Sequence, residues 1–400
     1  ISPGCYETVL DEAVLKRWIA HARAAGTFAF DTETDGLDPL RASPVGFSLA
    51  TARGKACYIP VKACDVEPLS LETVVRHLKG LLDDPGLVLV GQNIKFDYKV
   101  MRRCGVRLRT RLFDTMVAAW LADSERGSYS LDNLALQLLN YKTIHYEEAV
   151  GKDPQRTLAD IPAARATDYS GEDADIAYQL YERLSPELKD LGLEGVFYEL
   201  EMPLVEILAE MEIAGIRLDV RELAQYGKEL DKELARLEGE IFALCGHPFN
   251  IRSTKELQEV LFGELGLSPL KKTKTGQSTD TSVLLELARQ GAKVPELVLA
   301  HRSLAKLKST YVEALPGMVN PETGRLHTNY LQTGAATGRL ASRDPNLQNI
   351  PVREEEGRRI RAAFIPEPGC VFLSADYSQI ELVILAHLSE DPMLRQAFRE

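Results

Sequence analysis

Short apolar runs alternate with helical patterns from residue 26 to residue 190, and this alternation constrains the fold more than any other feature of the chain. The runs GTFAFDTETDG, VGFSLAT and ACYIPV have the length and the bounding turn residues of strands. LETVVRHLKGLL has the apolar spacing of a helix, and GLVLVGQN predicts a buried strand that leads into a helix at FDYKVMRRCG. The alternation predicts an α/β domain with a mixed sheet.

From Glu194 onward the pattern changes to long helices, FYELEMPLVEILAEMEIAG and ELAQYGKELDKELARLEGEIFALCG. The lysine-rich stretch LKKTKTGQSTD is expected to form the tip of this helical part. Strands are expected again from about Gly324, around RLHTNYLQT and GCVFLSADY. We therefore expect an α/β (α+β) chain in three parts, residues 1–190, 191–323 and 324–400.

Composition narrows the class of protein. The 400 residues are too many for one average domain, and 45% hydrophobic with 26% charged residues is ordinary for a folded protein. A net charge of −12 argues against a general nucleic-acid binder but allows an acidic enzyme with a basic groove. Six cysteines without a CxxC pair fit a reducing cytosol, and no apolar run reaches the length of a membrane span.

Two carboxylates follow the apolar run FAF. Asp31 and Glu33 lie two residues apart on the predicted strand, so both side chains leave the same face. Adjacent carboxylates on one face are costly unless a cation joins them. Solvated acids at a strand end are the simpler interpretation of a DxE motif alone, but the apolar run favours a position at the mouth of a core strand.

Two further motifs extend this pattern. Asp97 lies early in the helix that follows a buried strand, and Tyr169 and Asp173 are four apart on one helical face. Alone, Asp97 could be a helix-terminus charge. Together, the four carboxylates could hold two Mg²⁺ or Mn²⁺ ions roughly 3.5–4 Å apart, an arrangement that hydrolyses phosphodiesters. The Tyr169 hydroxyl would then orient the attacking water.

These motifs resemble those of the 3′→5′ proofreading exonucleases. Asp31, Glu33, Asp97 and Asp173 stand at the four acidic positions of that family, and Tyr169 stands at its tyrosine. The resemblance implies a ribonuclease H-like exonuclease fold and removal of nucleotides from a DNA 3′ end. It also implies DNA-binding roles for three more residues, which are Leu37 as a wedge, Asn93 as a strand contact and Tyr146 as a stacking ring.

The second half of the chain offers donors suited to nucleic acid. TGAATGRLASRDPNLQNIP carries Arg339 and three amide side chains, which suit phosphates and the minor groove, although loop amides also satisfy their own backbone. HRSLAKLKSTY carries two cations four residues apart, a phosphate track or simply a solvated basic face. The residues concerned are Arg339, Asn346, Gln348, Asn349, Arg302 and Lys306.

A further aspartate, Asp376, lies in the apolar run VFLSADYSQIELVIL, which predicts a buried strand before it. Together with TGRL and DPNLQNIP, this segment resembles the first palm motif of family A DNA polymerases. Over the whole chain, the resemblance is to the large fragment of the bacterial members of this family. The resemblance implies a thumb at 191–323 and a palm from 324, with Arg339 and the amides reading the primer terminus. It also implies nucleotide or metal contacts for Asp376, Tyr377, Gln379, Glu381 and Arg353.

Two parts that this family needs do not occur in the 400 residues, namely a fingers helix with its cations and a second palm aspartate. We therefore expect a chain truncated after the first palm motif, which retains the exonuclease but has an incomplete polymerase site. Mg²⁺ and deoxynucleoside triphosphates would bind at the polymerase site only if it were complete.

The expected partners are primer–template DNA and a single-stranded DNA 3′ end. We also expect a monomer in the bacterial cytosol, associated with the nucleoid. Two alternatives remain open, a freestanding 3′→5′ exonuclease that trims DNA or RNA, and a non-catalytic DNA-binding fragment.

Overall fold

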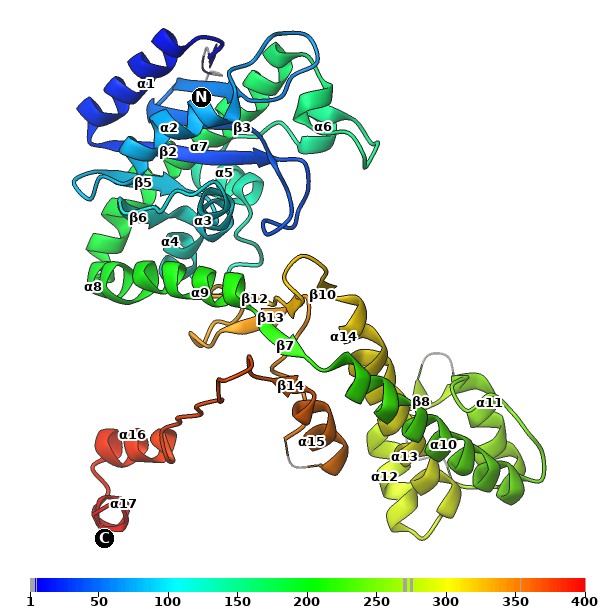
Figure 1. The fold of residues 1–400 in the computed structure, drawn as a ribbon. Helices are drawn as coiled ribbons and strands as arrows, with labels where there is room; N and C mark the ends of the chain where they lie inside the picture. Colours follow the sequence, from blue (N-terminus) through cyan, green and yellow to red (C-terminus); the bar gives the residue numbers. More distant parts are fainter. Residues whose placement is uncertain (1–3, 5, 269–271, 274–275, 353, 400) are drawn as a thin grey trace. The chain divides into compact units, whose positions relative to one another are not determined.

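The computed structural model describes residues 4, 6–268, 272–273, 276–352 and 354–399 (Figure 1). The chain divides into two compact units, residues 1–215 with 327–350, and residues 216–326 with 351–400. This grouping differs from the division expected from the sequence, because residues 191–215 and 327–350 pack with the α/β part. Each unit is described by itself below.

The first unit is built on a six-stranded mixed sheet with the order β1-β4-β3-β2-β5-β6. β3 pairs antiparallel with both β2 and β4, whereas the pairs β1–β4, β2–β5 and β5–β6 are parallel. The mixed sheet confirms the predicted fold class. Its strands are β1 (Glu7–Thr8), β2 (Thr27–Thr34), β3 (Pro44–Ala52), β4 (Lys55–Pro60), β5 (Val88–Gly91) and β6 (Arg111–Asp114).

Helices cover this sheet, and the longest of them, α7, packs against β2, β3 and β4. Phe28, Ala29 and Phe30 of β2 are all buried, so consecutive residues contact protein on both faces of the sheet. The helices of this part are α1 (Glu12–Ala25), α2 (Leu71–Leu82), α3 (Ile94–Arg103), α4 (Thr115–Ala122), α5 (Leu131–Leu139), α6 (Tyr146–Val150) and α7 (Ala163–Asp190).

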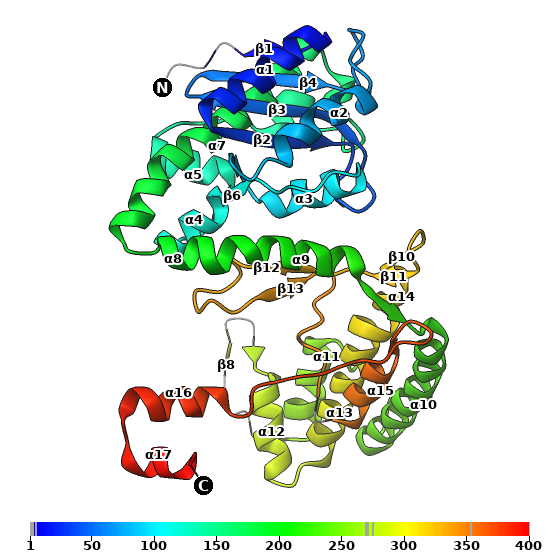
Figure 2. The ribbon, with the colours of Figure 1, turned by 60° about the vertical axis from the view of Figure 1, so that its left-hand side comes forward.

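A helix and a hairpin complete the first unit. α8 (Glu194–Val196) continues through a π-helical segment, Phe197–Glu201, into α9 (Met202–Ala214), as the predicted long helix requires. α9 packs against α3 and against β12 (Asn329–Leu331), which pairs antiparallel with β13 (Ala341–Arg343). Figure 2 shows the hairpin running alongside α9.

The second unit is mainly helical. α13 packs against both α10 and α12 around apolar residues such as Ile241, Leu284 and Val298. A small sheet has the order β10-β11-β7-β14. The main elements are α10 (Val220–Cys245), α11 (Thr254–Gln258), α12 (Thr281–Arg289), α13 (Lys293–Leu307), α14 (Ala314–Gly317), α15 (Glu355–Ala362), β7 (Ile216–Leu218), β10 (Val319–Asn320), β11 (Arg325–Leu326) and β14 (Phe364–Ile365).

The expected basic tip is described only in part. β8 (Lys272–Thr273) pairs antiparallel with β9 (Gly276–Gln277). Residues 270–271 and 274–275 of LKKTKTGQSTD lie outside the described residues. Within the part of the chain that the structure describes, every helix is too short or too polar to cross a bilayer.

The prediction of a buried strand before Asp376 is wrong for this structure. Residues 370–377 form no strand, and Val371 and Leu373 are 86% and 93% exposed. Among the described residues, none pairs with this segment in a sheet, so its apolar side chains have no partner face to pack against. α16 (Ile380–Ser389) and α17 (Pro392–Ala397) follow.

The packing of α5 yields a matched pair of substitutions. Leu134 is 0% exposed, whereas Leu136, on the same helix, is 54% exposed. We expect Leu134→Ala to lower the free energy of unfolding by about 2–5 kcal/mol, because it leaves a cavity. Leu136→Ala should change it by less than about 0.5 kcal/mol.

Urea denaturation followed by tryptophan fluorescence measures this difference. The chain has two tryptophans, Trp18 and Trp120, and both lie in the first unit, so their emission reports its unfolding alone. Equal losses in the two variants would contradict the described position of α5.

Candidate active site

A pocket of about 750 Å³ in the first unit brings the predicted exonuclease residues together. β2 supplies two of its acidic side chains, α3 supplies one, and α7 supplies one together with a tyrosine. Three motifs that are far apart in the sequence therefore line one cavity. The residues concerned are Asp31, Glu33, Asp97, Tyr169 and Asp173.

The chain between β5 and α3 directs Asp97 toward this pocket. Asn93, at the start of α3, has a left-handed backbone with φ of 60°, a conformation that asparagine tolerates better than most residues. The buried carboxylate of Asp114 accepts hydrogen bonds from the backbone N–H groups of Asn93 (3.1 Å) and Ile94 (2.8 Å). A residue at the end of β6 thus satisfies the first amides of α3.

Asp97 is joined directly to β2. Its Oδ1 atom accepts hydrogen bonds from the backbone N–H of Thr32 (2.9 Å) and from the Thr32 hydroxyl (2.6 Å). Because Asp97 is only 2% exposed, these bonds replace contacts with water that burial removes. Thr32 lies between Asp31 and Glu33, so the same strand segment carries two acids and positions the third.

Burial is the main cause that raises the pKa of all four carboxyl groups. The pKa of Asp31 rises to about 7, and that of Glu33 rises to about 8, with repulsion from Asp31 as the second cause. Burial and then Asp31 raise the pKa of Asp97 well above its usual range. Burial, and then the charges of Glu33 and Asp31, do the same for Asp173.

The donor chemistry of the pocket fits a hard divalent cation. All the side chains that would bind it offer oxygen, which Mg²⁺ and Mn²⁺ prefer. Oε1 of Glu33 is buried and has no hydrogen-bond partner among the described residues. Across that same part of the chain, no group of three His, Cys, Asp or Glu side chains is arranged to hold a metal ion.

The three residues expected to hold DNA at the exonuclease site, Leu37, Asn93 and Tyr146, also line this pocket. Leu37 is 96% exposed, and Asn93 lies at the start of α3. The ring of Tyr146 meets that of Tyr169 edge to face, with centroids 5.8 Å apart. Burial, and then the charge of Asp173, raise the pKa of Tyr169, so its hydroxyl stays protonated at neutral pH.

Sequence reasoning missed several residues of the site. Lys152 and Arg156 line the pocket and bring positive charge to an acidic cavity. In the sequence, these two cations are indicated only by the polar stretch GKDPQR, which follows Tyr146 by a few residues. The sequence indicates Thr32, which positions Asp97, only as a threonine between two acids. It indicates Asp114, which caps α3, only as an aspartate that ends an apolar run.

In the second unit, Arg302 and Lys306 of α13 line one cavity of about 800 Å³, consistent with their four-residue spacing. Arg302 donates a hydrogen bond to the backbone oxygen of Thr279 (2.7 Å). Burial lowers the pKa of Arg302, with the charge of Asp280 opposing it.

The predicted amide cluster lies in the first unit and partly satisfies its own backbone. Gln348 donates from its backbone N–H to Oδ1 of Asn346 and from its side chain to the oxygen of Leu340, both at 3.0 Å. Arg339 and Asn349 are exposed.

The residues expected at the polymerase site do not converge in this structure. Asp376, Gln379 and Glu381 are exposed, and Tyr377 is 79% exposed. Gln379 precedes α16 with φ of 50°, and Glu381 lies in the first turn of that helix. Arg353 lies outside the described residues.

The raised pKa values predict how stability responds to pH without metal. A carboxyl whose folded pKa exceeds its unfolded value stabilises the fold at low pH, and this stability is lost as the pH rises through the folded value, here about 7–8. In EDTA, Glu33→Gln should therefore raise the free energy of unfolding on the order of 2 kcal/mol at pH 9 and much less at pH 5.

Urea denaturation at both pH values checks this prediction. Glu147→Gln is the matched control, because Glu147 lines the same pocket but is exposed. That variant should stay within about 0.5 kcal/mol of the parent. A Glu33→Gln variant less stable than the parent at pH 9 would show that burial and repulsion do not destabilise the ionised Glu33 carboxylate in the folded protein.

Comparisons with known proteins match two families to successive segments of the chain. The family described as 3'-5' exonuclease matches residues 6–189, and the family described as DNA polymerase family A matches residues 220–400. DNA polymerase I of Rhizobium leguminosarum is 43% identical over 99% of this chain and 41% of its own length. DNA polymerase I of Treponema pallidum is 44% identical over 100% and 43%, respectively.

A solved structure is also similar. The POL domain of Pol1 from M. smegmatis, in complex with DNA primer-template and dNTP, matches with a TM-score of 0.83 and 32% identity, over 98% of this chain and 64% of that one. The chain spans about two fifths of the length of the curated relatives named above. On these matches, the chain carries a 3'-5' exonuclease segment, residues 6–189, followed by a segment of DNA polymerase family A, residues 220–400.

Proposed function

We propose that this chain removes nucleotides from the 3′ end of DNA by metal-dependent hydrolysis, as the proofreading component of a DNA polymerase I type enzyme. The observation that carries the proposal is the single pocket that Asp31, Glu33, Asp97, Tyr169 and Asp173 line together. A family A segment that follows the exonuclease segment makes a freestanding RNA-trimming enzyme a poorer explanation.

The four carboxylates would hold two Mg²⁺ or Mn²⁺ ions, which, when bound, activate water and stabilise charge on the leaving oxygen. Tyr169 remains a hydrogen-bond donor at neutral pH and would orient the attacking water. Thr32 holds Asp97 in place from β2. The cations Lys152 and Arg156 would approach the phosphates of the substrate.

The 3′ end itself would be held by three residues at the same pocket. Leu37, with almost its whole side chain exposed, would separate the terminal bases. Tyr146 offers a partly exposed ring on which a base can stack, and Asn93 would bind the strand.

For the polymerase segment, we propose primer–template DNA as the partner. Arg302 and Lys306 would bind phosphates, while Arg339 and the amides of Asn346, Gln348 and Asn349 would read the minor groove. Deoxynucleoside triphosphate and Mg²⁺ would bind near Asp376, Tyr377, Gln379, Glu381 and Arg353 in a complete site. The proposed setting is a monomer on DNA in the bacterial cytosol.

The decisive substitution is Asp97→Ala. We expect it to lower the rate of hydrolysis of a 5′-labelled single-stranded oligonucleotide by about 1,000-fold in Mg²⁺, because loss of metal-assisted charge stabilisation costs several kcal/mol. Binding of the same oligonucleotide in EDTA, measured by fluorescence anisotropy, should change less than about twofold, since other residues hold the strand.

Asp153→Ala is the control for this experiment, because Asp153 lines the same pocket but is exposed. Hydrolysis by Asp97→Ala at the parental rate would reject the metal-site assignment. The parent is also incubated with a primer on a longer template, with and without the four deoxynucleotides. Shortening in both conditions supports an exonuclease, whereas lengthening with nucleotides reveals template-directed synthesis.

A further inference from the structure

Helix α3, which carries Asp97, is bound by one buried carboxylate of helix α9, that of Glu212. Lys95 and Lys99 lie two residues on either side of Asp97, and both donate to Glu212 of α9. Lys95 binds Oε1 of Glu212 and Lys99 binds Oε2. The side chains of the two lysines are 8% exposed and that of Glu212 is 1% exposed, so water scarcely competes for these charges.

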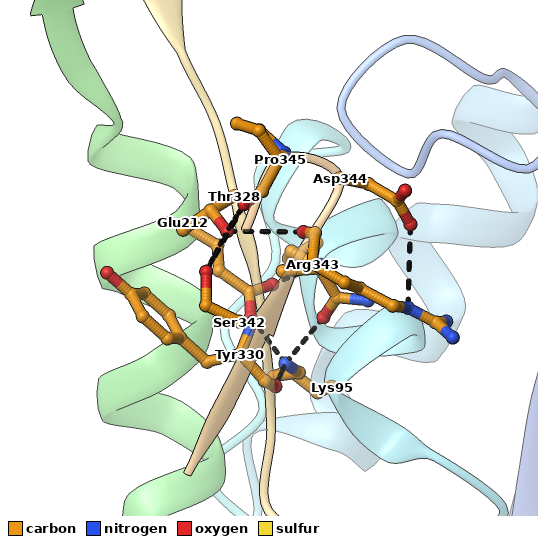
Figure 3. A network of polar contacts seen from close by, with 10 residues as sticks. Lys95, Glu212, Thr328, Tyr330, Ser342, Arg343, Asp344 and Pro345 are labelled. Atoms are coloured by element: carbon orange, nitrogen blue, oxygen red, sulfur yellow. Dashed lines mark hydrogen bonds and ion pairs between the residues drawn. The ribbon is translucent and has the colours of Figure 1, made fainter. Parts of the chain in front are cut away.

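The same carboxylate is bound to the β12–β13 hairpin. The backbone N–H of Tyr330 donates to Oε1 of Glu212 (2.7 Å), and Lys95 donates to Oδ1 of Asn329 (2.9 Å) and to the backbone oxygen of Tyr330. Figure 3 shows Lys95, Glu212 and Tyr330 meeting in this network. Glu212 therefore joins the exonuclease helix α3 to the strand β12, within one compact unit.

The hairpin is itself firmly held. The Thr328 and Ser342 hydroxyls are 2.7 Å apart, and the Thr328 hydroxyl donates to the backbone oxygen of Pro345 at 2.7 Å. A ring nitrogen of His327 lies 2.7 Å from the backbone oxygen of Glu212. These hydrogen bonds hold the hairpin and join it to the backbone of Glu212, whose carboxylate in turn binds the two lysines.

Glu212 lies outside both segments that the family comparisons match, 6–189 and 220–400, whereas Lys95 and Tyr330 lie inside one each. α3 is fixed at its beginning by Asp114, and the Asp97 carboxylate is held by Thr32 of β2. Tyr98 and Arg102 of α3 also bind α9, through Glu210. The two ion pairs to Glu212, one helical turn apart, add a buried restraint on the rotation and the axial position of α3 around Asp97.

We propose that Glu212 is a positioning residue for the exonuclease metal site, acting through Lys95 and Lys99 on helix α3 and so on the carboxylate of Asp97. The inference rests on the proposed exonuclease function. It adds that residues of the polymerase segment, Asn329 and Tyr330, take part in placing a metal ligand of the exonuclease. Displacement of a ligand by about 1 Å can cost about 100-fold in rate.

The test compares Glu212→Gln with Glu201→Gln in the full chain. Glu201 is also buried and accepts a hydrogen bond from Gln332 (2.8 Å), but none of its hydrogen bonds involves α3 among the described residues. We would measure exonuclease kcat and KM on a single-stranded oligonucleotide, together with the Mg²⁺ concentration that gives half-maximal activity. Mn²⁺ affinity would be measured by electron paramagnetic resonance. All measurements are made below the temperature at which each variant unfolds.

We expect Glu212→Gln to lower kcat and to weaken Mn²⁺ binding by about 10-fold each, with KM changed less than about twofold, because supporting residues around metal sites act on ligand geometry. Glu201→Gln should match the parent. Lys99→Met, which leaves a neutral Lys95–Glu212 pair, should show a smaller change in the same direction and covers the case in which Glu212→Gln does not fold.

Parental kcat and parental Mn²⁺ affinity in folded Glu212→Gln, or in Lys99→Met if the former does not fold, would overturn the inference. A parent that binds Mn²⁺ but leaves DNA intact would overturn the proposed function instead. In that case weaker Mn²⁺ binding by Glu212→Gln would still support the positioning role.

Discussion

The burial of four carboxylates in one pocket, where charge repulsion adds to the cost of burial, is the constraint on which the rest of the first unit depends. Burial raises the pKa of all four carboxyl groups, and the charge of Asp31 further raises the pKa of Glu33, Asp97 and Asp173. The metal-free fold is therefore stable only if other interactions hold the carboxylates together. Much of the surrounding structure supplies interactions that hold these carboxylates together.

Two kinds of interaction meet this requirement, apolar burial and hydrogen bonds to charged groups. The strand β2 is buried through Phe28, Ala29 and Phe30, which anchors the two acids that follow. Hydrogen bonds from Thr32 hold Asp97 against the same strand, and Asp114 satisfies the first amides of α3. Apolar burial therefore supplies the framework, while hydrogen bonds to charged groups define the positions within it.

The first unit also shows that a family boundary and a structural boundary need not coincide. Residues 327–350 match the polymerase family but pack with the exonuclease part. The hydrogen bonds of Lys95 and Glu212 explain this, because they tie β12 to α3 in a buried, water-poor setting. The amide-bearing loop that was expected to read the primer terminus consequently belongs to the same compact unit as the exonuclease pocket.

The amino-acid sequence by itself determined the local features. Period-two alternation placed Asp31 and Glu33 on one face of a strand, and helical spacing placed Tyr169 and Asp173 together, because both depend only on neighbouring residues. The mixed α/β class and the long helix that begins near residue 194 followed from the same periodicity. The tertiary structure decided which distant residues meet, as Thr32 does with Asp97, and Glu212 with two lysines more than 100 positions earlier. It also decided that the segment before Asp376 is exposed. No local pattern encodes these outcomes, since a buried charge or strand is stabilised only by the partner that packing brings to it.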